Sequence, residues 1–374
     1  MRILIPTLEY PPQIGGIGSY VFNLAKSWPS KSDEHIICAP KQTRDDIFDK
    51  QNTLKVYRKN MIFKIFRPRW LKLFFILLKI IKNEKIERVL VHHVLPVGYV
   101  IYLINKIRKI KYDIFLHGYD FGLAIKRCSK SKKFAKICNK ADRIIVNSIF
   151  LQKKVIFEFP EFKEKIIVVY PCSSIQDTKI DPSRLNEIEK KYNPEKRPLI
   201  LTSSRIVKRK GHDMVIESLS KVIKEIPNVL YLICGNGEYK QELIKLAKKE
   251  KLEDSVKFID FVSRDDLPYM YSMANVFAMP SRQLNDLDVE GFGIVFIEAN
   301  LFGTPVIGGN SGGINEAIEN GKSGLVVDPN SDSDVADAIL KLLQDKELAT
   351  SLGRFGRNRV QTDFNWSKQL EKIL

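Results

Sequence analysis

The sequence predicts an α/β protein built from two doubly wound domains, and three features indicate this fold. The chain has 374 residues, which is enough for two domains. Short apolar runs alternate with helical stretches, which is typical of parallel sheets covered by helices on both faces. A polar stretch, residues 173–198, separates two such series. We therefore expect domains at residues 1–180 and 195–360, with a ligand-binding cleft where the loops at the strand ends converge.

The first domain should begin with a strand at residues 2–10, a glycine-rich turn and a helix at 20–28. Its other predicted strands are 35–40, 88–94, 112–118, 143–148 and 165–171. The second domain repeats this pattern, with helices that include 214–226 and 336–344. Its predicted strands are 198–204, 229–235, 256–261, 276–281, 304–309 and 324–329.

The composition is that of a soluble globular protein in a reducing compartment. Hydrophobic residues make up 44% of the chain and charged residues 28%. The 5 cysteines are scattered and form no CxxC pair, which argues against a disulfide framework or a zinc ribbon. The first strand contains Glu9 and leads into two prolines, so it is unlike a signal peptide, and we expect a cytoplasmic location.

The net charge of +17 is concentrated in two basic runs of the first half, residues 55–85 and 106–140. Such a surplus attracts polyanions, but no RNA or DNA module motif is present, so we expect no nucleic-acid partner. Residues 61–82 mix aromatic, aliphatic and basic side chains, and Lys72 and Lys79 interrupt them too often for a bilayer span. We interpret this segment as binding an anionic surface, on the inner face of the cell membrane. The alternative is an amphipathic helix packed on its own domain.

Two loops follow the first strand of each domain. PPQIGGIGSY (11–20) places glycines that include Gly16 before a helix, where backbone N–H groups can approach an anion. A tight turn that needs glycine is the alternative. SSRIVKRKGHD (203–213) gathers cations that include Arg205 and Lys210, which suits a diphosphate. Its alternative is a solvated basic turn.

The stretch DLDVEGFGIVFIEA (286–299) carries Glu290 and Glu298 at the two ends of a buried apolar segment. Two predicted strands bracket it, so it should contain a helix that begins between Phe292 and Ile294. The two carboxylates can then face one bound molecule from different depths. Carboxylates that accept hydroxyl hydrogen bonds suit sugars, and this pair could hold one ribose and one hexose.

Strand-end loops elsewhere offer weaker signals. His117, in HGYD, is expected at the rim of the cleft, although a lone histidine is usually structural. CGNGE (234–238) and DFVS (260–263) end two second-domain strands, and their backbone could line a nucleobase pocket.

In combination, PPQIGGIGSY, HGYD, SSRIVKRKG, CGNGE and EGFGIVFIEA resemble the retaining GT-B glycosyltransferases of family 4. The segment LDVEGFGIVFIEA is most similar to the bacterial mannosyltransferases that extend phosphatidylinositol. The resemblance covers nearly the whole chain in the right order. It implies two Rossmann-like domains facing across a cleft, with the acceptor in the first and the donor in the second. It also implies that a terminal helix at 364–374 packs back on the first domain.

The resemblance implies a role for each residue that matches the motifs of the family. Arg205 and Lys210 neutralise the diphosphate leaving group. Glu298 holds the ribose, Glu290 holds the transferred hexose, and His117 lies by the sugar at the reaction centre. The donor-binding residues implied are Gly16, Arg205, Lys210, Val262, Glu290, Gly291, Phe292, Gly293, Ile294 and Glu298.

Two departures from the motifs affect these expectations. The triplet DLD (286–288) matches the DxD motif that binds a metal in the other major glycosyltransferase fold. Here Arg205, Lys210 and a helix N-terminus can supply the positive charge, so we interpret DLD as a solvated loop and expect no metal or other cofactor. The loop after VVYP reads CSS where many relatives have an Asn-Gly turn, which could alter the hinge or the acceptor side.

The expected reaction moves a hexosyl group from a nucleotide diphosphate to a hydroxyl of a membrane-associated glycan or glycolipid, with retention at the anomeric carbon. By resemblance the first choice of donor is GDP-mannose, while UDP-glucose, UDP-galactose and UDP-N-acetylglucosamine stay open. No carboxylate of the motifs is an obvious covalent nucleophile, which favours same-face attack. The alternatives are a GT-B nucleotide-sugar epimerase and a non-catalytic scaffold that binds a sugar nucleotide.

Overall fold

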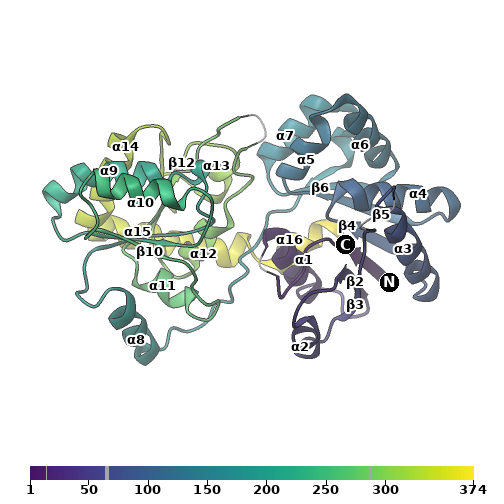
Figure 1. Ribbon diagram of the computed structural model, residues 1–374, viewed down its shortest axis with the longest axis horizontal. Coiled ribbons are helices and arrows are strands. Elements are labelled where there is room, and N and C mark those ends of the chain that lie inside the picture. The colour runs from purple at the N-terminus through teal and green to yellow at the C-terminus, as the bar shows by residue number, and fades with distance from the viewer. Residues whose placement is uncertain (14, 64–66, 286–287) are drawn as a thin grey trace. The chain divides into compact units, whose positions relative to one another are not determined.

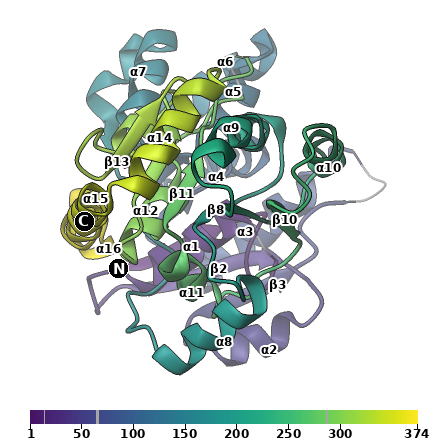
Figure 2. The same cartoon turned by 90° about the vertical axis from the view of Figure 1, so that its left-hand side faces the viewer.

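The computed structural model describes residues 1–13, 15–63, 67–285 and 288–374, and it divides into two compact units. Unit 1 comprises Met1–Ser174 and Trp366–Leu374, and unit 2 comprises Ile175–Asn365. Each unit holds one parallel sheet with helices on both faces (Figures 1 and 2). The predicted α/β class, with two doubly wound Rossmann-like sheets, is confirmed.

The sheet of unit 1 has seven strands in the order β3-β2-β1-β4-β5-β6-β7. These strands are buried apolar runs such as Ile3–Ile5, whose side chains are fully covered, as expected for a sheet with helices on both faces. The strands are β1 (Arg2–Pro6), β2 (Glu34–Pro40), β3 (Lys55–Lys59), β4 (Arg88–Val91), β5 (Lys111–Leu116), β6 (Arg143–Val146) and β7 (Ile166–Val168).

The helices of unit 1 cover the sheet from two sides. One core joins the sheet to α3, α4, α6 and α7, and a second core joins it to α1 and the tail helix α16. The helices are α1 (Gly16–Lys26), α2 (Asp45–Lys50), α3 (Leu71–Asn83), α4 (Tyr99–Ile107), α5 (Tyr119–Ile125), α6 (Cys128–Lys140), α7 (Ile149–Glu158) and α16 (Trp366–Leu370). The tail therefore contributes to the core of unit 1, although the 191 preceding residues, Ile175–Asn365, belong to unit 2.

The sheet of unit 2 has six strands in the order β10-β9-β8-β11-β12-β13. They are β8 (Leu199–Ser203), β9 (Leu230–Cys234), β10 (Val256–Ile259), β11 (Val276–Met279), β12 (Val306–Gly309) and β13 (Gly324–Val327). Helix α9 packs against α10 and α14, and α12 packs against α11 and α15 (Figure 2). The helices are α8 (Pro182–Tyr192), α9 (His212–Glu225), α10 (Lys240–Lys249), α11 (Leu267–Met273), α12 (Ile294–Leu301), α13 (Ile314–Ala317), α14 (Asp332–Gln344) and α15 (Lys346–Asp363).

Strand β3 and helix α8 lie in segments where the sequence prediction expected no strand and no helix, respectively. Strand β3 lies at the edge of its sheet within the basic run, and its Lys55 and Tyr57 both bond to Glu84. Helix α8 lies in the stretch read as a polar connection. It begins at Pro182, and the side chain of Asp181 accepts hydrogen bonds from the backbone of its first turn.

Within the described residues, none of the helices combines the length and the apolar character needed to cross a membrane.

Candidate functional site

Close backbone approaches pack three loops of unit 2 together at the carboxyl ends of its strands. A Cβ atom at Gly211, where φ is +76°, would lie 2.1 Å from the carbonyl oxygen of Pro280. A Cβ atom at Gly235 would lie 2.0 Å from the carbonyl oxygen of Ser204. Because only glycine allows such contacts, these positions bring the loop after β8 against the loops after β9 and β11.

An ion cluster forms where the loop after β8 meets the loop after β11. Lys208–Lys210 make a 3₁₀ turn that ends at Gly211. The Nζ atom of Lys210 lies 2.5 Å from Oε2 of Glu290, and Nη1 of Arg209 lies 2.7 Å from the same oxygen. The Nε atom of Arg209 also donates to Oδ1 of Asp288, at 2.8 Å. Glu290 therefore shares one carboxylate oxygen between two cations.

The electrostatics of this cluster keep Glu290 ionised. Burial opposes ionisation, but the charges of Lys210 and Arg209 outweigh it and lower the pKa of Glu290 to about 2. Burial also lowers the pKa of Lys210, although the Glu290 carboxylate acts in the opposite direction. Oε2 is occupied, so Oε1 is the oxygen that can accept a hydrogen bond from a ligand hydroxyl.

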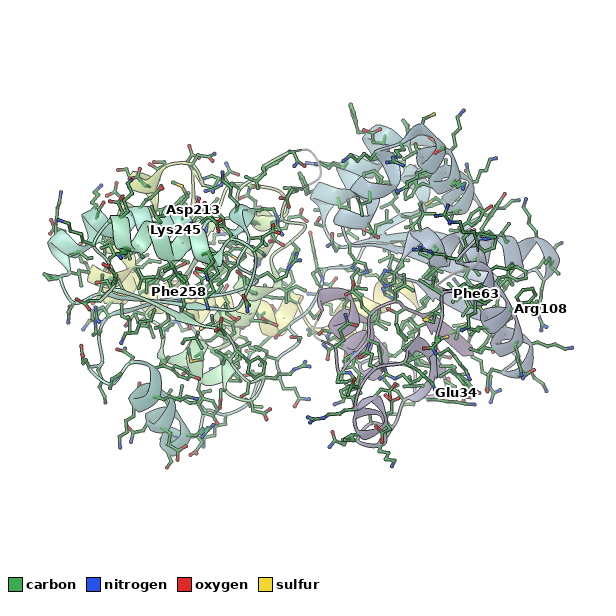
Figure 3. All side chains as sticks on the ribbon, viewed as in Figure 1. Glu34, Phe63, Arg108, Asp213, Lys245 and Phe258 are labelled. Atoms are coloured by element: carbon green, nitrogen blue, oxygen red, sulfur yellow. The ribbon has the colours of Figure 1, made fainter. Side chains whose placement is uncertain are left out.

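A second ion pair, between Arg282 and Asp213, ties the loop after β11 to the first turn of α9. Arg282 bonds through its guanidinium to Oδ2 of Asp213, the acidic residue in the first turn of α9 that Figure 3 labels. The backbone N–H of Arg282 donates to the carbonyl of Arg209 at 2.9 Å. The polypeptide that leads to Asp288 and Glu290 is thus tied to the turn that carries Arg209 and Lys210.

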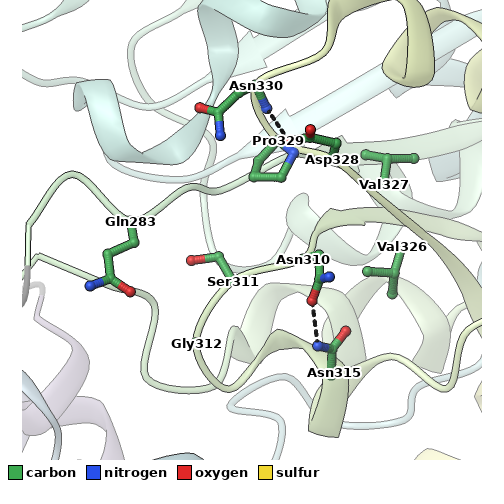
Figure 4. A pocket seen from close by; sticks show the side chains of 10 residues that line it. All are labelled: Gln283, Asn310, Ser311, Gly312, Asn315, Val326, Val327, Asp328, Pro329 and Asn330. Atoms are coloured by element: carbon green, nitrogen blue, oxygen red, sulfur yellow. Dashed lines mark hydrogen bonds between the residues drawn. The ribbon is translucent and has the colours of Figure 1, made fainter.

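The loop from Glu290 to Gly293 leads into α12, which begins at Ile294. Gly293 occupies the N-cap position with φ +93° and gives the helix no side-chain cap, so the first N–H groups are available to a ligand. The backbone N–H of Gly313, just before α13, donates to the carbonyl of Glu290 at 2.9 Å and holds the loop against the segment after β12, which lines the pocket seen in Figure 4. Phe292 is buried, and its ring packs 5.4 Å from that of Phe364, so only its backbone can serve the site.

Glu298 lies inside α12 and is buried. The hydroxyl of Tyr271, from α11, donates to its Oε2 at 3.3 Å. Burial and the neighbouring carboxylate hold the pKa of Tyr271 well above its usual value, so this hydroxyl remains a donor. A carboxylate has about four lone-pair sites, so this one bond leaves Glu298 able to accept hydrogen bonds from sugar hydroxyls as well.

Arg205 and Val262 lie in other strand-end loops of unit 2. Arg205 follows β8 and its side chain is exposed, which leaves its guanidinium accessible to an anion. Val262 follows β10 and is half-buried, while the preceding Phe261 is 66% exposed. An exposed aromatic ring at this position can stack on a planar base.

The sequence prediction left out several residues that shape this site. Arg209 was noted as one of a basic run, but its bonds to Asp288 and Glu290 depend on the approach of Gly211 to Pro280. Asp288 was taken as part of a solvated loop, and it is instead paired with a buried guanidinium. Asp286 and Leu287, the rest of that triplet, lie outside the described residues. Phe261 and Tyr271 belong to no sequence motif that would have marked them as site residues.

Gly16 and His117 belong to unit 1. Helix α1 begins at Gly16 without a side-chain cap, and a Cβ atom added there would meet no described atom within 4 Å. One turn later, the ring of Tyr20 lies 5.1 Å from that of His117 and 5.1 Å from that of Trp366 in the tail. The tail helix therefore helps to position the side chain that contacts His117.

His117 is half-buried and lies with two buried histidines, His92 and His93, at the ends of β4 and β5. Its Nε2 lies 3.2 Å from Nδ1 of His92, and Nε2 of His93 lies 3.2 Å from Oγ1 of Thr7. Burial lowers the pKa of His117 to about 3 and that of His93 to about 4, so both rings are neutral at pH 7. His117 can therefore offer a hydrogen bond to a ligand, but not a positive charge.

Asp120 closes the HGYD turn. Its Oδ1 accepts the backbone N–H of His117 at 2.9 Å, which orients the loop. Burial raises the pKa of Asp120 to about 6, although four backbone N–H groups act in the opposite direction. Asp120 therefore gains or loses its charge near pH 6, whereas His117 of the same loop stays neutral there.

Comparison with known proteins identifies relatives along the whole chain. A family model described as "Glycosyl transferases group 1" matches residues 183–359, and one described as "Glycosyltransferase Family 4" matches residues 14–174. The GDP-mannose-dependent alpha-(1-6)-phosphatidylinositol monomannoside mannosyltransferase of Mycobacterium tuberculosis is 30% identical, over 100% of this chain and 97% of that protein. The GDP-mannose-dependent monoacylated alpha-(1-6)-phosphatidylinositol monomannoside mannosyltransferase of Corynebacterium glutamicum is 27% identical, over 100% of this chain and 96% of that protein.

Solved structures share the fold. A glycosyltransferase from Rickettsia africae superposes with a TM-score of 0.84 at 22% identity, covering 99% of this chain and 96% of that one. HepE of Anabaena, solved in complex with UDP and glucose, superposes with a TM-score of 0.84 at 19% identity, covering 100% and 98% of the two chains.

Proposed function

The chain belongs to the glycosyltransferases of group 1 and family 4, and from this premise we propose that it transfers mannose from GDP-mannose to a membrane-associated glycolipid or glycan. The observation that carries the proposal is the cluster of Arg209, Lys210 and Glu290 beside the uncapped N-terminus of α12. Cations and free N–H groups suit a diphosphate, and a carboxylate with an available oxygen suits a hexose hydroxyl. The full-length relatives named as GDP-mannose-dependent support the choice of donor.

In the proposed reaction, Arg205 and Lys210 stabilise the negative charge that develops on the departing diphosphate. Arg209 holds Glu290 in place and adds to the positive charge beside it. Glu290 receives a hydroxyl of the transferred hexose, and Glu298 receives the ribose. Gly16 offers its backbone N–H to the phosphates, Val262 lies beside the base, and His117 donates or accepts one hydrogen bond at the sugar.

We propose that the sugar is transferred with retention, by attack of the acceptor on the face from which the diphosphate leaves. A double displacement needs a carboxylate free to attack the anomeric carbon. Glu290 is a poor candidate because two cations share its Oε2 and its pKa is about 2. The leaving phosphate oxygen can take the proton of the acceptor hydroxyl instead. Fixed cations already supply the charge that a metal would bring, so we propose that no metal is needed.

The decisive measurement is mannosyl transfer from GDP-mannose to a phosphatidylinositol mannoside, followed by NMR of the new anomeric centre. We expect an α-linked product, full activity in EDTA, and no turnover of the donor alone beyond slow hydrolysis. Activity that EDTA abolishes and Mg²⁺ or Mn²⁺ restores would reject the metal-free mechanism. Turnover of the nucleotide sugar without an acceptor would favour an epimerase, and binding without any turnover would favour a scaffold. Efficient use of UDP-glucose but not GDP-mannose would overturn the donor assignment.

We further propose that unit 1 binds the inner face of the cell membrane through α3, α4 and α6. Helix α4 packs against both α3 and α6. Trp70, before α3, lies 5.4 Å from Tyr99 of α4, and Nζ of Lys133 of α6 lies 5.1 Å from the same ring. Aromatic rings and cations therefore link the three helices into one surface. Basic side chains near an anionic bilayer contribute about 1 kcal/mol each.

The exposed side chains of this surface suit a membrane interface. Phe75 of α3 is 60% exposed and Ile107 of α4 is 71% exposed. Exposed lysines on α6 and the exposed Arg108 at the end of α4, which Figure 3 labels, flank them. Apolar side chains can enter the acyl boundary while the cations remain on headgroups. The expected location is therefore cytoplasmic and peripheral.

Phe75→Glu should weaken binding to phosphatidylglycerol vesicles by at least tenfold, because it places a negative charge on the docking surface. The matched control is Ile244→Glu, which alters an exposed apolar residue on the basic helix α10 of unit 2 and should leave binding unchanged. Co-sedimentation with anionic and neutral vesicles measures both. Equal loss in the two variants, or wild-type binding that is independent of lipid charge, would contradict this surface.

A further inference from the structure

The ring of His92 stacks against two other rings at the ends of β4 and β5. The two strands run in parallel, and Val91 lies opposite Ile114. The next residues along them are His92 and Phe115, whose rings stack with their centroids 4.3 Å apart. His117 lies two residues beyond Phe115, where side chains share one face of a strand, and its ring centroid is 5.5 Å from that of His92. The register of the sheet thus holds His92 against His117.

A hydrogen bond also joins the edges of the two histidine rings. Nδ1 of His92 lies 3.2 Å from Nε2 of His117. Burial lowers the pKa of both rings, so each is neutral at pH 7 and carries a single N–H group. One ring must therefore donate this bond and the other must accept it. The direction of the bond decides whether Nδ1 of His117 carries a proton or a lone pair.

The second ring nitrogen of His92 indicates the direction. His92 is completely buried, and its Nε2 has no hydrogen-bond partner among the described residues. A proton on Nε2 would leave a buried N–H group without an acceptor, which is rarer in folded proteins than an acceptor without a donor. A proton on Nδ1 instead pairs the N–H group of the ring with Nε2 of His117. The second arrangement is therefore favoured.

The neighbouring polar groups do not reverse this direction. Asp120 accepts the backbone N–H of His117 and not its ring. The hydroxyl of Thr7 donates to the carbonyl of Glu9 at 2.7 Å, so its oxygen accepts the bond from Nε2 of His93. His93 thus has a partner of its own. In the part of the chain that the structure describes, Nδ1 of His117 makes no hydrogen bond, so it is the ring nitrogen left for a ligand.

We propose that His92 is a positioning residue, which donates from Nδ1 to Nε2 of His117 and thereby makes Nδ1 of His117 a hydrogen-bond donor. The inference rests on the proposed function for the assignment of His117 to the sugar. A donor at this place can bond to an oxygen of the transferred hexose. A nitrogen that already carries a proton cannot take another from the acceptor hydroxyl, so His117 is not the base and that proton passes to the leaving phosphate oxygen.

The direction of the bond can be measured by ¹⁵N NMR of the histidine rings, because protonated and bare ring nitrogens resonate far apart. The chain has 5 histidines, so selective labelling gives few signals, and single substitutions assign them. At pH 7.5 the full chain should show His92 and His117 each protonated on Nδ1. His93, which donates to Thr7, should show the opposite pattern and provides an internal reference. A proton on Nε2 of His117 in the wild type would overturn the proposal.

His92→Phe tests what this bond does for the reaction. Phenylalanine keeps a ring stacked on Phe115 and removes the donor, so His117 should populate both tautomers. We expect kcat to fall about tenfold, the effect of one misdirected hydrogen bond, while the donor KM stays within about twofold. His92→Asn returns an N–H donor close to the position of Nδ1. It should restore part of the Nδ1 tautomer of His117 and, with it, part of kcat.

His35→Phe is the matched control, because it replaces a buried histidine of the same unit whose ring packs on Trp28. It should leave both the His117 signals and kcat at pH 7.5 unchanged. Equal kcat values in His92→Phe and His35→Phe, or an unaltered tautomer of His117 in His92→Phe, would reduce His92 to a packing residue. If His92→Phe does not fold, the wild-type spectrum still decides. That spectrum needs no turnover, so a failure of the proposed mannosyl transfer would show separately in the activity assay.

Discussion

Lys210→Met should reduce kcat by about 10²- to 10³-fold, the loss typical when one group that stabilises developing charge is removed. Lys210 is buried beside Glu290, so its ammonium is held in place before the donor arrives. Methionine keeps most of the side-chain volume and removes only the charge. Lys208→Met is the matched control, since Lys208 lies in the same turn with an exposed side chain. Steady-state kinetics that find equal kcat values in both variants would remove Lys210 from the reaction centre.

Replacing the opposite partner should have a different effect on stability. Lys210→Met leaves Glu290 paired with Arg209, whereas Glu290→Ala leaves both cations without their shared carboxylate. Loss of one partner from a buried ion pair costs about 3–5 kcal/mol, so Glu290→Ala should be the less stable variant in urea unfolding. A bound diphosphate supplies negative charge at the same place. GDP should therefore raise the stability of Glu290→Ala more than that of the wild type. An equal GDP effect would mean that the diphosphate does not meet these cations.

The sequence predicts the frame of this site better than its internal contacts. Apolar runs place Arg205 and His117 at strand ends and Glu290 in the loop before a helix, because a buried parallel strand needs a continuous apolar stretch and a polar loop after it. The helix that begins at Ile294 was predictable for the same reason. The edge strand β3 has the sequence KVYRK and shows no apolar run, since charged side chains are tolerated at a sheet edge.

The partners within the site could not be predicted, because they depend on tertiary approaches. Glu290 could have paired with any cation of the run 205–210. The approach of Gly211 to Pro280 selects Arg209 and Lys210, and it directs Arg209 to Asp288 as well. Likewise, Glu298 meets Tyr271 only because α11 and α12 are neighbours in space. A single sequence contains the residues of such pairs, but it does not determine which residue pairs with which.

The second large effect is a loss of stability in acid that should fall mainly on unit 1. All 5 histidines of the chain have a lowered pKa, because burial disfavours the charged ring. The pKa is about 4 for His35, His93 and His212, and about 3 for His117. The unfolded chain takes up protons below its ordinary histidine pKa of about 6.5, while the folded chain does not. Stability is therefore fully present above pH 6.5 and is lost as the pH falls toward 4.

The magnitude follows from the size of these shifts. A histidine whose pKa falls from 6.5 to about 4 contributes at most ~3 kcal/mol by pH 4, since one pKa unit corresponds to ~1.4 kcal/mol. Asp120 acts in the opposite direction, because its pKa is raised to about 6 and folding binds its proton between pH 6 and about 4. One carboxyl cannot offset the histidines. Of these, His35, His92, His93 and His117 lie in unit 1, and His212 lies in unit 2.

The positions of the tryptophans allow the two units to be followed separately. Trp28, Trp70 and Trp366 are the 3 tryptophans of the chain, and all belong to unit 1. Urea unfolding at pH 7.5, 6 and 5 should therefore show a tryptophan-fluorescence midpoint that falls steeply with pH. The far-UV circular dichroism of unit 2 should persist to higher urea.

His35→Phe provides the sharpest check on the cause. His35 is buried, its ring lies 4.9 Å from that of Trp28, and its Nε2 has no hydrogen-bond partner among the described residues. Phenylalanine can occupy the same site without titrating. Below pH 6.5 the variant should lose up to ~1.4 kcal/mol less stability per pH unit than the wild type, because it removes one proton from the linkage. Parallel pH profiles for the two proteins, or fluorescence and circular dichroism midpoints that fall together, would show that acid sensitivity does not originate in the buried histidines of unit 1.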